Sequence, residues 1–210
     1  MSHILVVCAK RYNGHELWVA LGVMQQRGHT FEIVSQDTII RDEITLRPNL
    51  TNRTVWKVSR SEIVNYDGIM IVSGNMQDTE AYWDDKHVLG LIEETNAQGK
   101  AVAAICCSVS TIRTVAEGKK VSFYPLVRAR HRLASAGAIL QTVALTRDDN
   151  LVTAEHQMAS QVWAEEFCNL LEGKPQEHNF TDSKFTPKGR ERKPIPELEE
   201  LKEKLRRRNG

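Results

Sequence analysis

The stretch "AVAAICCSVSTI" at residues 101–112 decides the fold class, because it joins a buried strand to a helix through two adjacent cysteines. Residues 101–106 form a short apolar run, which is typical of a strand that is covered on both faces. Small hydroxylated side chains follow, and residues 108–118 read as a helix closed by Gly118. We therefore predict a strand that turns into a helix at Cys106 and Cys107.

The same alternation of apolar runs and helical patterns extends on both sides of this stretch. Strands are predicted at residues 3–9, 30–35, 54–59 and 66–74, with two further β runs around an Asp-Asp-Asn turn at 140–155. Helices are predicted at residues 14–27, 84–99, 127–138 and 158–174. Alternating strands and helices predict a three-layer α/β sandwich, in which a mostly parallel sheet has helices on both faces.

Sites in such sheets form at the carboxyl ends of the strands, and three segments are candidates here. They are the region after Ala9, the turn at 73–75 and the cysteine pair. At the last of these, a cysteine would lie at a helix N-terminus, where unpaired N–H groups and the helix dipole favour a thiolate. The alternative is that both cysteines are small apolar fillers of the core.

The composition bounds the class of protein. The chain has 210 residues, 41% of them hydrophobic and 26% charged, and its net charge is +1. This balance gives no reason to expect a nucleic-acid or membrane partner, and no apolar stretch approaches the roughly 18 residues of a membrane span. The run at residues 3–9 is interpreted as a first strand and not as a signal peptide.

The four cysteines are Cys8, Cys106, Cys107 and Cys168, and their spacing fits neither a zinc site nor a disulfide framework. We therefore expect no metal, and a reducing, cytoplasmic setting.

The composition changes near residue 174. Residues 1–173 form the predicted α/β domain, and residues 174–210 form a charged C-terminal extension with an excess of basic side chains. We interpret the extension as an arm followed by a short charged helix. It is either a solvated tail or a segment that docks on the body or on a partner subunit, with nucleic-acid contact as the last alternative.

Two segments resemble the ThiJ/PfpI superfamily, which has the flavodoxin-like, class I glutamine-amidotransferase-like fold. They are "GKAVAAICCSVSTI" at 99–112 and "DGIMIVSGN" at 67–75, and "NGHELWVA" at 13–20 adds a glutamate early in the first helix. The resemblance covers about residues 3–172. It implies that Cys106 is the reactive cysteine and that Glu16 hydrogen-bonds to it. The N–H groups of Gly74 and Cys107 match the oxyanion-hole donors.

Glu16 also has a structural interpretation, because a glutamate three residues after the N-cap Asn13 could simply complete a capping box. The chain departs from the family pattern at two places. Many hydrolytic members have a histidine directly after the cysteine, where this chain has Cys107, and Ser73 replaces the first glycine of a Gly-Gly pair. His15, His131 and His156 are candidate substitutes for the missing base, and His156 follows a strand end on the expected side of the sheet.

The resemblance implies a cysteine-dependent enzyme that acts on small reactive carbonyl compounds or their adducts, with glyoxalase-like or deglycase-like chemistry, or that hydrolyses a C–N bond. With this activity we expect a small-molecule carbonyl substrate and no cofactor. The resemblance also implies a homodimer or higher homo-oligomer. The alternative is a redox sensor or chaperone-like protein with an oxidisable Cys106. An inactive scaffold whose extension recruits a partner is the third class.

Overall fold

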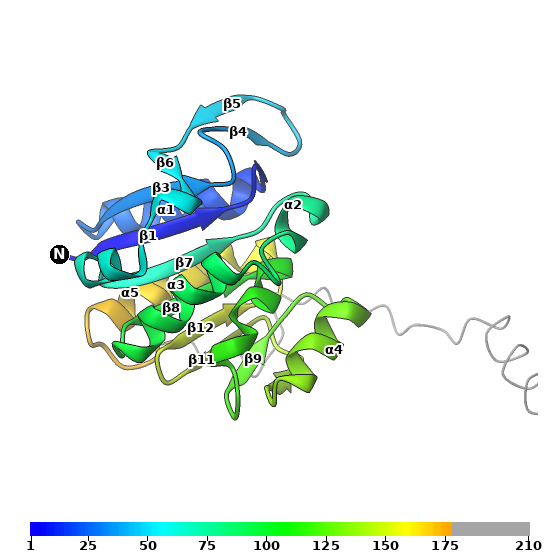
Figure 1. The fold of residues 1–210 in the computed structure, drawn as a ribbon. Helices are drawn as coiled ribbons and strands as arrows, with labels where there is room; N and C mark the ends of the chain where they lie inside the picture. Colours follow the sequence, from blue (N-terminus) through cyan, green and yellow to red (C-terminus); the bar gives the residue numbers. More distant parts are fainter. Residues whose placement is uncertain (178–210) are drawn as a thin grey trace, which may run out of the picture.

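The computed structural model describes residues 1–177, which form a three-layer α/β sandwich (Figure 1). Its central sheet has seven strands in the order β11-β12-β8-β7-β1-β3-β6. All neighbouring strands are parallel except β11 and β12, which are antiparallel. The strands are β1 (His3–Cys8), β3 (Thr30–Ser35), β6 (Arg53–Thr54), β7 (Gly68–Val72), β8 (Ala101–Ile105), β11 (Leu145–Asp148) and β12 (Leu151–Ala154).

Helices cover both faces of this sheet. On one face, α1 (Gly14–Gln26) packs against α5 (Ser160–Leu171), and on the other α3 (Lys86–Ala97) packs against the 3-10 helix η3 (Cys106–Val115). Side chains of a strand alternate between faces, and in β1 they divide between two buried clusters. Ile4, Val6 and Cys8 join the cluster under α1 and α5, while Leu5 and Val7 join the other.

Smaller elements flank the central sheet. A three-stranded sheet contains β2 (Arg11–Tyr12), β4 (Ile39–Asp42) and β5 (Pro48–Leu50), and β9 (Lys120–Ser122) pairs with β10 (Ile139–Gln141). The short helices are α2 (Met76–Glu80), α4 (Val127–Ser135), η1 (Val55–Lys57), η2 (Arg60–Asn65) and η4 (Gln157–Ala159). Within residues 1–177, no helix combines the length and apolarity that crossing a bilayer requires.

The predicted sandwich is confirmed, with two local differences. The strand predicted at 54–59 is wrong, because β6 ends at Thr54 and η1 follows. Val55 and Val58 are buried and Trp56 is half-exposed, which is the period of a 3-10 turn and not of a strand. The helix predicted at 108–118 begins earlier, at Cys106, and is a 3-10 helix. The charged helix predicted in the C-terminal extension lies outside the described residues.

Candidate active site

The chain reverses sharply where β8 ends. Cys106 has a φ of 58°, in the left-handed region that side chains other than glycine rarely adopt. The Ser108 hydroxyl holds the turn together: it accepts a hydrogen bond from the Ile105 N–H (3.1 Å) and lies 2.8 Å from the Ile71 carbonyl and 2.7 Å from that of Ile105. The hydroxyl thus links β7, β8 and η3, and the turn leaves Cys106 only partly buried.

Glu16 reaches this turn from the first helical turn of α1. Its side chain is completely buried, and Oε2 accepts hydrogen bonds from the N–H (2.9 Å) and the hydroxyl (2.7 Å) of Ser73. Asn13 caps α1 by accepting the Glu16 N–H (3.1 Å), but its own N–H donates to the Ser73 carbonyl (2.9 Å). The Glu16 carboxyl therefore does not complete a capping box, and the structural interpretation of this residue is wrong.

The surroundings of the Glu16 carboxyl favour its protonated form. Burial raises its pKa well above the usual range, a charge on Cys106 raises the pKa further, and the bonds from Ser73 only partly oppose this. Both bonds from Ser73 end on Oε2, so the proton belongs on Oε1. That oxygen is buried and has no hydrogen-bond partner among the described residues. The protonated form of Glu16 thus has one O–H donor next to the Cys106 turn.

The two thiols of the pair have different roles. The Cys106 thiol donates to the Cys107 sulfur, 3.7 Å away, and Cys107 is buried. This contact holds the proton on Cys106, and together with burial it raises the pKa of the Cys106 thiol. Ser73 and the Cys107 N–H favour the thiolate but do not prevail. The lower pKa expected from a helix N-terminus is therefore not found, because the neighbouring thiol and burial outweigh it.

Gly74 lies at the end of β7, where the backbone comes very close to β2. A Cβ atom at this position would lie 2.0 Å from the Arg11 carbonyl oxygen, so only glycine fits. The Gly74 N–H donates to the Thr79 hydroxyl (3.1 Å), so this predicted oxyanion donor is already engaged. The other predicted donor, the Cys107 N–H, is directed at the Cys106 sulfur.

His156 lies at the same edge of the sheet, because Ala154 at the end of β12 pairs with Ile105 at the end of β8. Its Nδ1 accepts the Met158 N–H (3.0 Å) and caps η4. Nδ1 is therefore occupied, and only Nε2 remains to meet a substrate. The side chains of His15 and His131 are exposed on α1 and α4.

Polar residues that the sequence did not indicate complete the surroundings. The Asn13 amide donates to Glu43 (2.8 Å) and to Gln157 (2.6 Å), and so ties the segment after β4 to η4. Burial raises the pKa of Glu43, and the charge of Glu43 contributes to the raised pKa of Glu16. Glu43 lies outside every strand and helix predicted from the sequence. Across residues 1–177, no three His, Cys, Asp or Glu side chains are grouped as a metal site.

Comparisons with known proteins show the family of this chain. The DJ-1/PfpI family model matches residues 2–170. An uncharacterized protein of Methanocaldococcus jannaschii is 23% identical over 176 residues, which cover 80% of this chain and 82% of that protein.

Two solved structures illustrate the likeness of fold. A ThiJ/PfpI domain protein from Brachyspira murdochii has a TM-score of 0.74 at 18% identity, covering 82% of this chain and 98% of that one. DJ-1 of Schizosaccharomyces pombe has a TM-score of 0.70 at 16% identity, covering 83% and 93%. Because the family model matches most of the sequence, this chain belongs to the DJ-1/PfpI family.

Proposed function

We propose that this chain is a cysteine-dependent enzyme that acts on small reactive carbonyl compounds or their adducts, with Cys106 as the nucleophile. The observation that carries the proposal is the left-handed backbone at Cys106 beside the buried carboxyl of Glu16, whose pKa burial raises. Strained backbone of this kind persists where the surroundings enforce it, and it clusters at functional sites. A carboxyl whose pKa is raised by burial is suited to general acid catalysis.

The addition step forms one C–S bond and moves two protons. As the Cys106 sulfur attacks the carbonyl carbon, the Oε1 proton of Glu16 passes to the carbonyl oxygen, and the thiol proton replaces it on Glu16. The product is a hemithioacetal, and no charge is left in the buried site. Because the pKa of Cys106 is raised, the thiol is the resting form, and its proton has to leave as the C–S bond forms.

For a 2-oxo aldehyde, the hemithioacetal can rearrange without an external oxidant. A proton leaves C1 and one returns to C2, so that C1 reaches the oxidation level of a thioester and C2 becomes an alcohol. Water then releases the 2-hydroxy acid and the thiol. The Cys107 N–H is the proposed oxyanion donor, and Gly74 joins it once its bond to Thr79 opens. The Nε2 atom of His156 is the proposed proton carrier for the water.

Turnover of methylglyoxal by the full-length chain tests this proposal, with the 2-hydroxy acid identified by NMR. Cys106→Ser should abolish product formation, and Glu16→Gln should reduce kcat by about a hundredfold or more, in line with the loss of a general acid. Cys168→Ser is the matched control, because Cys168 is buried in α5. Equal rates for wild type and Cys106→Ser would refute the nucleophile assignment. Release of an amine from a glycated substrate, without product from methylglyoxal, would favour C–N bond hydrolysis.

The redox-sensing alternative rests on the unpartnered Oε1 of Glu16, whose proton could hold an oxygen of an oxidised Cys106. Two equivalents of peroxide would convert the thiol to sulfenic and then to sulfinic acid, each releasing one water. The raised pKa of Cys106 opposes this alternative, because the thiolate is the form that peroxide oxidises. Mass spectrometry after peroxide treatment tests it: a gain of two oxygens on Cys106, in a chain without turnover, would favour the sensor.

We propose a homodimer in the cytoplasm as the setting of this activity. Large apolar side chains are exposed around the β4–β5 hairpin, at Ile44, Leu46 and Leu50, and Trp18 on α1 is half-exposed. A second copy of the chain is the proposed cover for these side chains, and sedimentation equilibrium measures it directly. The four cysteines are all unpaired, which agrees with a reducing compartment and is checked by cell fractionation.

A further inference from the structure

A basic pocket of about 410 Å³ lies beside α4, on the face of the sheet that carries α3 and η3. It is formed where the C-terminal half of η3 meets α4 and the segment between α2 and α3. Its lining residues are Asp84, Arg113, His131, Arg132, Ser135 and Ala136. None of these residues belongs to the Cys106 site described above.

Two guanidinium groups in this pocket have buried N–H groups without acceptors. Arg113 Nη1 and Arg132 Nε are each buried and have no hydrogen-bond partner among the described residues. Leaving a buried donor unpaired costs about 1–3 kcal/mol, and more for a charged group. Donors of this kind require an explanation, such as a bound ion or ligand that accepts from them.

The charges around the pocket are also unbalanced. Arg113 and Arg132 share one oxygen of one carboxylate, Oδ1 of Asp84, and the Asp84 side chain is 68% exposed. Two cations therefore face one anion. The guanidinium of Arg132 is held in place, since it stacks on the Trp83 ring (5.4 Å) and donates to the Trp83 carbonyl (3.2 Å).

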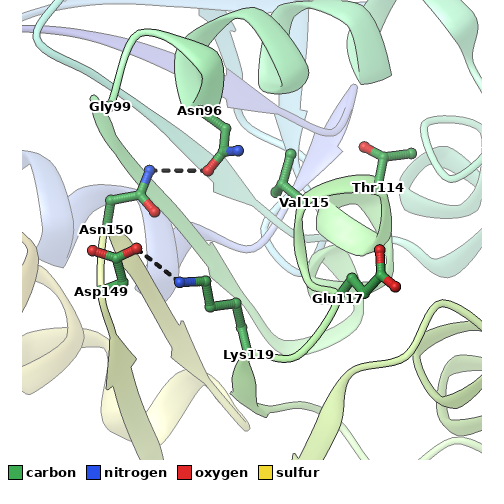
Figure 2. A pocket seen from close by; sticks show the side chains of 8 residues that line it. All are labelled: Asn96, Gly99, Thr114, Val115, Glu117, Lys119, Asp149 and Asn150. Carbon is green, nitrogen blue, oxygen red and sulfur yellow. Dashed lines mark hydrogen bonds and ion pairs between the residues drawn. The ribbon is translucent and has the colours of Figure 1, made fainter.

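A second pocket of the same volume provides a contrast (Figure 2). It lies near the N-terminal end of β8, and four of its polar side chains form two pairs. Lys119 forms an ion pair with Asp149 (2.7 Å), and the Asn150 amide donates to Asn96 (3.0 Å). These groups need no ligand, whereas the guanidinium donors beside α4 lack acceptors.

We propose that the pocket beside α4 binds the phosphoryl group of a small phosphorylated metabolite. Two guanidinium groups present rigid, forked donors, which match phosphate oxygens well. The His131 ring and the Ser135 hydroxyl add donors from α4, so the set exceeds what the two oxygens of a carboxylate can accept. The pocket volume leaves room for the remainder of the metabolite.

This site is separate from Cys106 but lies on the same element. Arg113 follows Cys106 by seven residues along η3, a distance of about 14 Å at the rise of a 3-10 helix. The Trp83 ring, on which the Arg132 guanidinium stacks, donates its indole N–H to the Cys107 carbonyl (2.9 Å). The proposed phosphoryl site would therefore hold the distal end of a bound molecule or a separate effector, and it does not rest on the activity proposed for Cys106.

Isothermal titration of the full-length chain with inorganic phosphate, at constant ionic strength, tests the site. Arg113→Gln and Arg132→Gln should each weaken phosphate binding by roughly tenfold or more, the loss expected for a charged hydrogen bond. Asp84→Asn should strengthen it, because it removes the carboxylate that competes for both guanidinium groups. Arg130→Gln is the matched control: it makes the same change on the same helix, but Arg130 lies over Phe123 and outside the pocket.

Opposite effects of Asp84→Asn and the two arginine variants cannot arise from misfolding, so they distinguish binding from stability. Acetate, titrated in parallel, should bind more weakly than phosphate. Equal loss of affinity in Arg130→Gln would overturn the proposal, as would unchanged binding in both pocket arginine variants. Cys106→Ser should keep full phosphate affinity, and its failure to bind phosphate would place the anion at the Cys106 turn instead.

Discussion

Cys8 and Cys106 lie at the same edge of the sheet, at the ends of β1 and β8 on either side of β7. Cys8 remains within its strand, is completely buried, and points its thiol at the Val34 carbonyl (3.8 Å). Burial raises the pKa of Cys8 to about 12. Cys106 leaves its strand through a left-handed turn, is partly exposed, and has the Glu16 carboxyl as a neighbour.

The difference shows that a thiol at a carboxyl strand end is not sufficient for chemistry. Both sulfurs sit in surroundings that favour the neutral form, so charge does not separate them. They differ because only Cys106 has access to solvent and has the Glu16 carboxyl as a neighbour. Access comes from the turn that Ser108 holds, and the acid comes from α1 through Ser73.

The largest expected difference between Cys8 and Cys106 is in their rates of labelling by limiting iodoacetamide. Cys106 should be labelled at least about a hundredfold faster than Cys8, because exposing Cys8 requires opening β1 at a cost of about 3 kcal/mol or more. Peptide mass spectrometry over a time course measures both rates in one sample. Cys168, which is also buried, serves as an internal reference and should follow Cys8. Faster labelling at Cys8 or Cys107 would remove the basis for assigning Cys106 as the nucleophile.

The fold was largely predictable because its signals are local. The apolar runs of β1 and β8 and the N-cap at Asn13 each involve a few consecutive residues. Gly28, which directly follows the helix predicted at 14–27, has a φ of 76°. The error at 54–59 arose because a β-branched run can also close a 3-10 turn, and burial by neighbouring elements decides between them.

The site was predictable only in its two central residues. Cys106 and Glu16 were indicated by turn chemistry and by resemblance, and the structure brings them together. The turn at 73–75 was a candidate segment, but Ser73 itself was noted only as a departure from glycine, and its bond to Glu16 spans 57 residues. Contacts between distant segments leave no periodic pattern, so no local signal indicated the bond between Ser73 and Glu16 or a role for Glu43.

Replacing Glu16 by glutamine tests whether the Cys106 end contains a neutral carboxyl. The raised pKa of Glu16 means that the native state keeps a proton that the unfolded chain releases above about pH 4.5. The stability contributed by protonated Glu16 is full below that pH and is lost as the pH rises toward the folded-state pKa. Glu16→Gln has no such loss. Its free energy of unfolding relative to wild type should therefore increase with pH, by up to about 1.4 kcal/mol per unit.

Denaturant titrations between pH 3 and 8 measure this free energy of unfolding. Glu62→Gln, measured in the same way, is a control whose stability should depend on pH in the opposite direction. The Ser59 N–H, with further help from Arg53, lowers the pKa of Glu62 to about 2. Its contribution is present above about pH 4.5 and is lost as the pH falls toward 2, so this variant should be less stable than wild type near pH 7 and approach it in acid. A Glu16→Gln difference that is independent of pH would mean that Glu16 is ionised in the folded chain.

The smallest expected effect comes from replacing Cys107. Its sulfur contacts the Cys106 thiol, and this contact distinguishes Cys106 from Cys8. Cys107→Ala removes the sulfur that accepts the Cys106 thiol proton, so the pKa of Cys106 should fall. The rate of labelling Cys106 at pH 7 should then rise several-fold, since the thiolate is the nucleophile. The pH profile of that rate gives the pKa directly, and Cys8→Ala is the control because it removes a thiol without touching this contact. An unchanged profile in Cys107→Ala would show that burial alone keeps Cys106 protonated, and the two strand ends would then differ only in exposure and in Glu16.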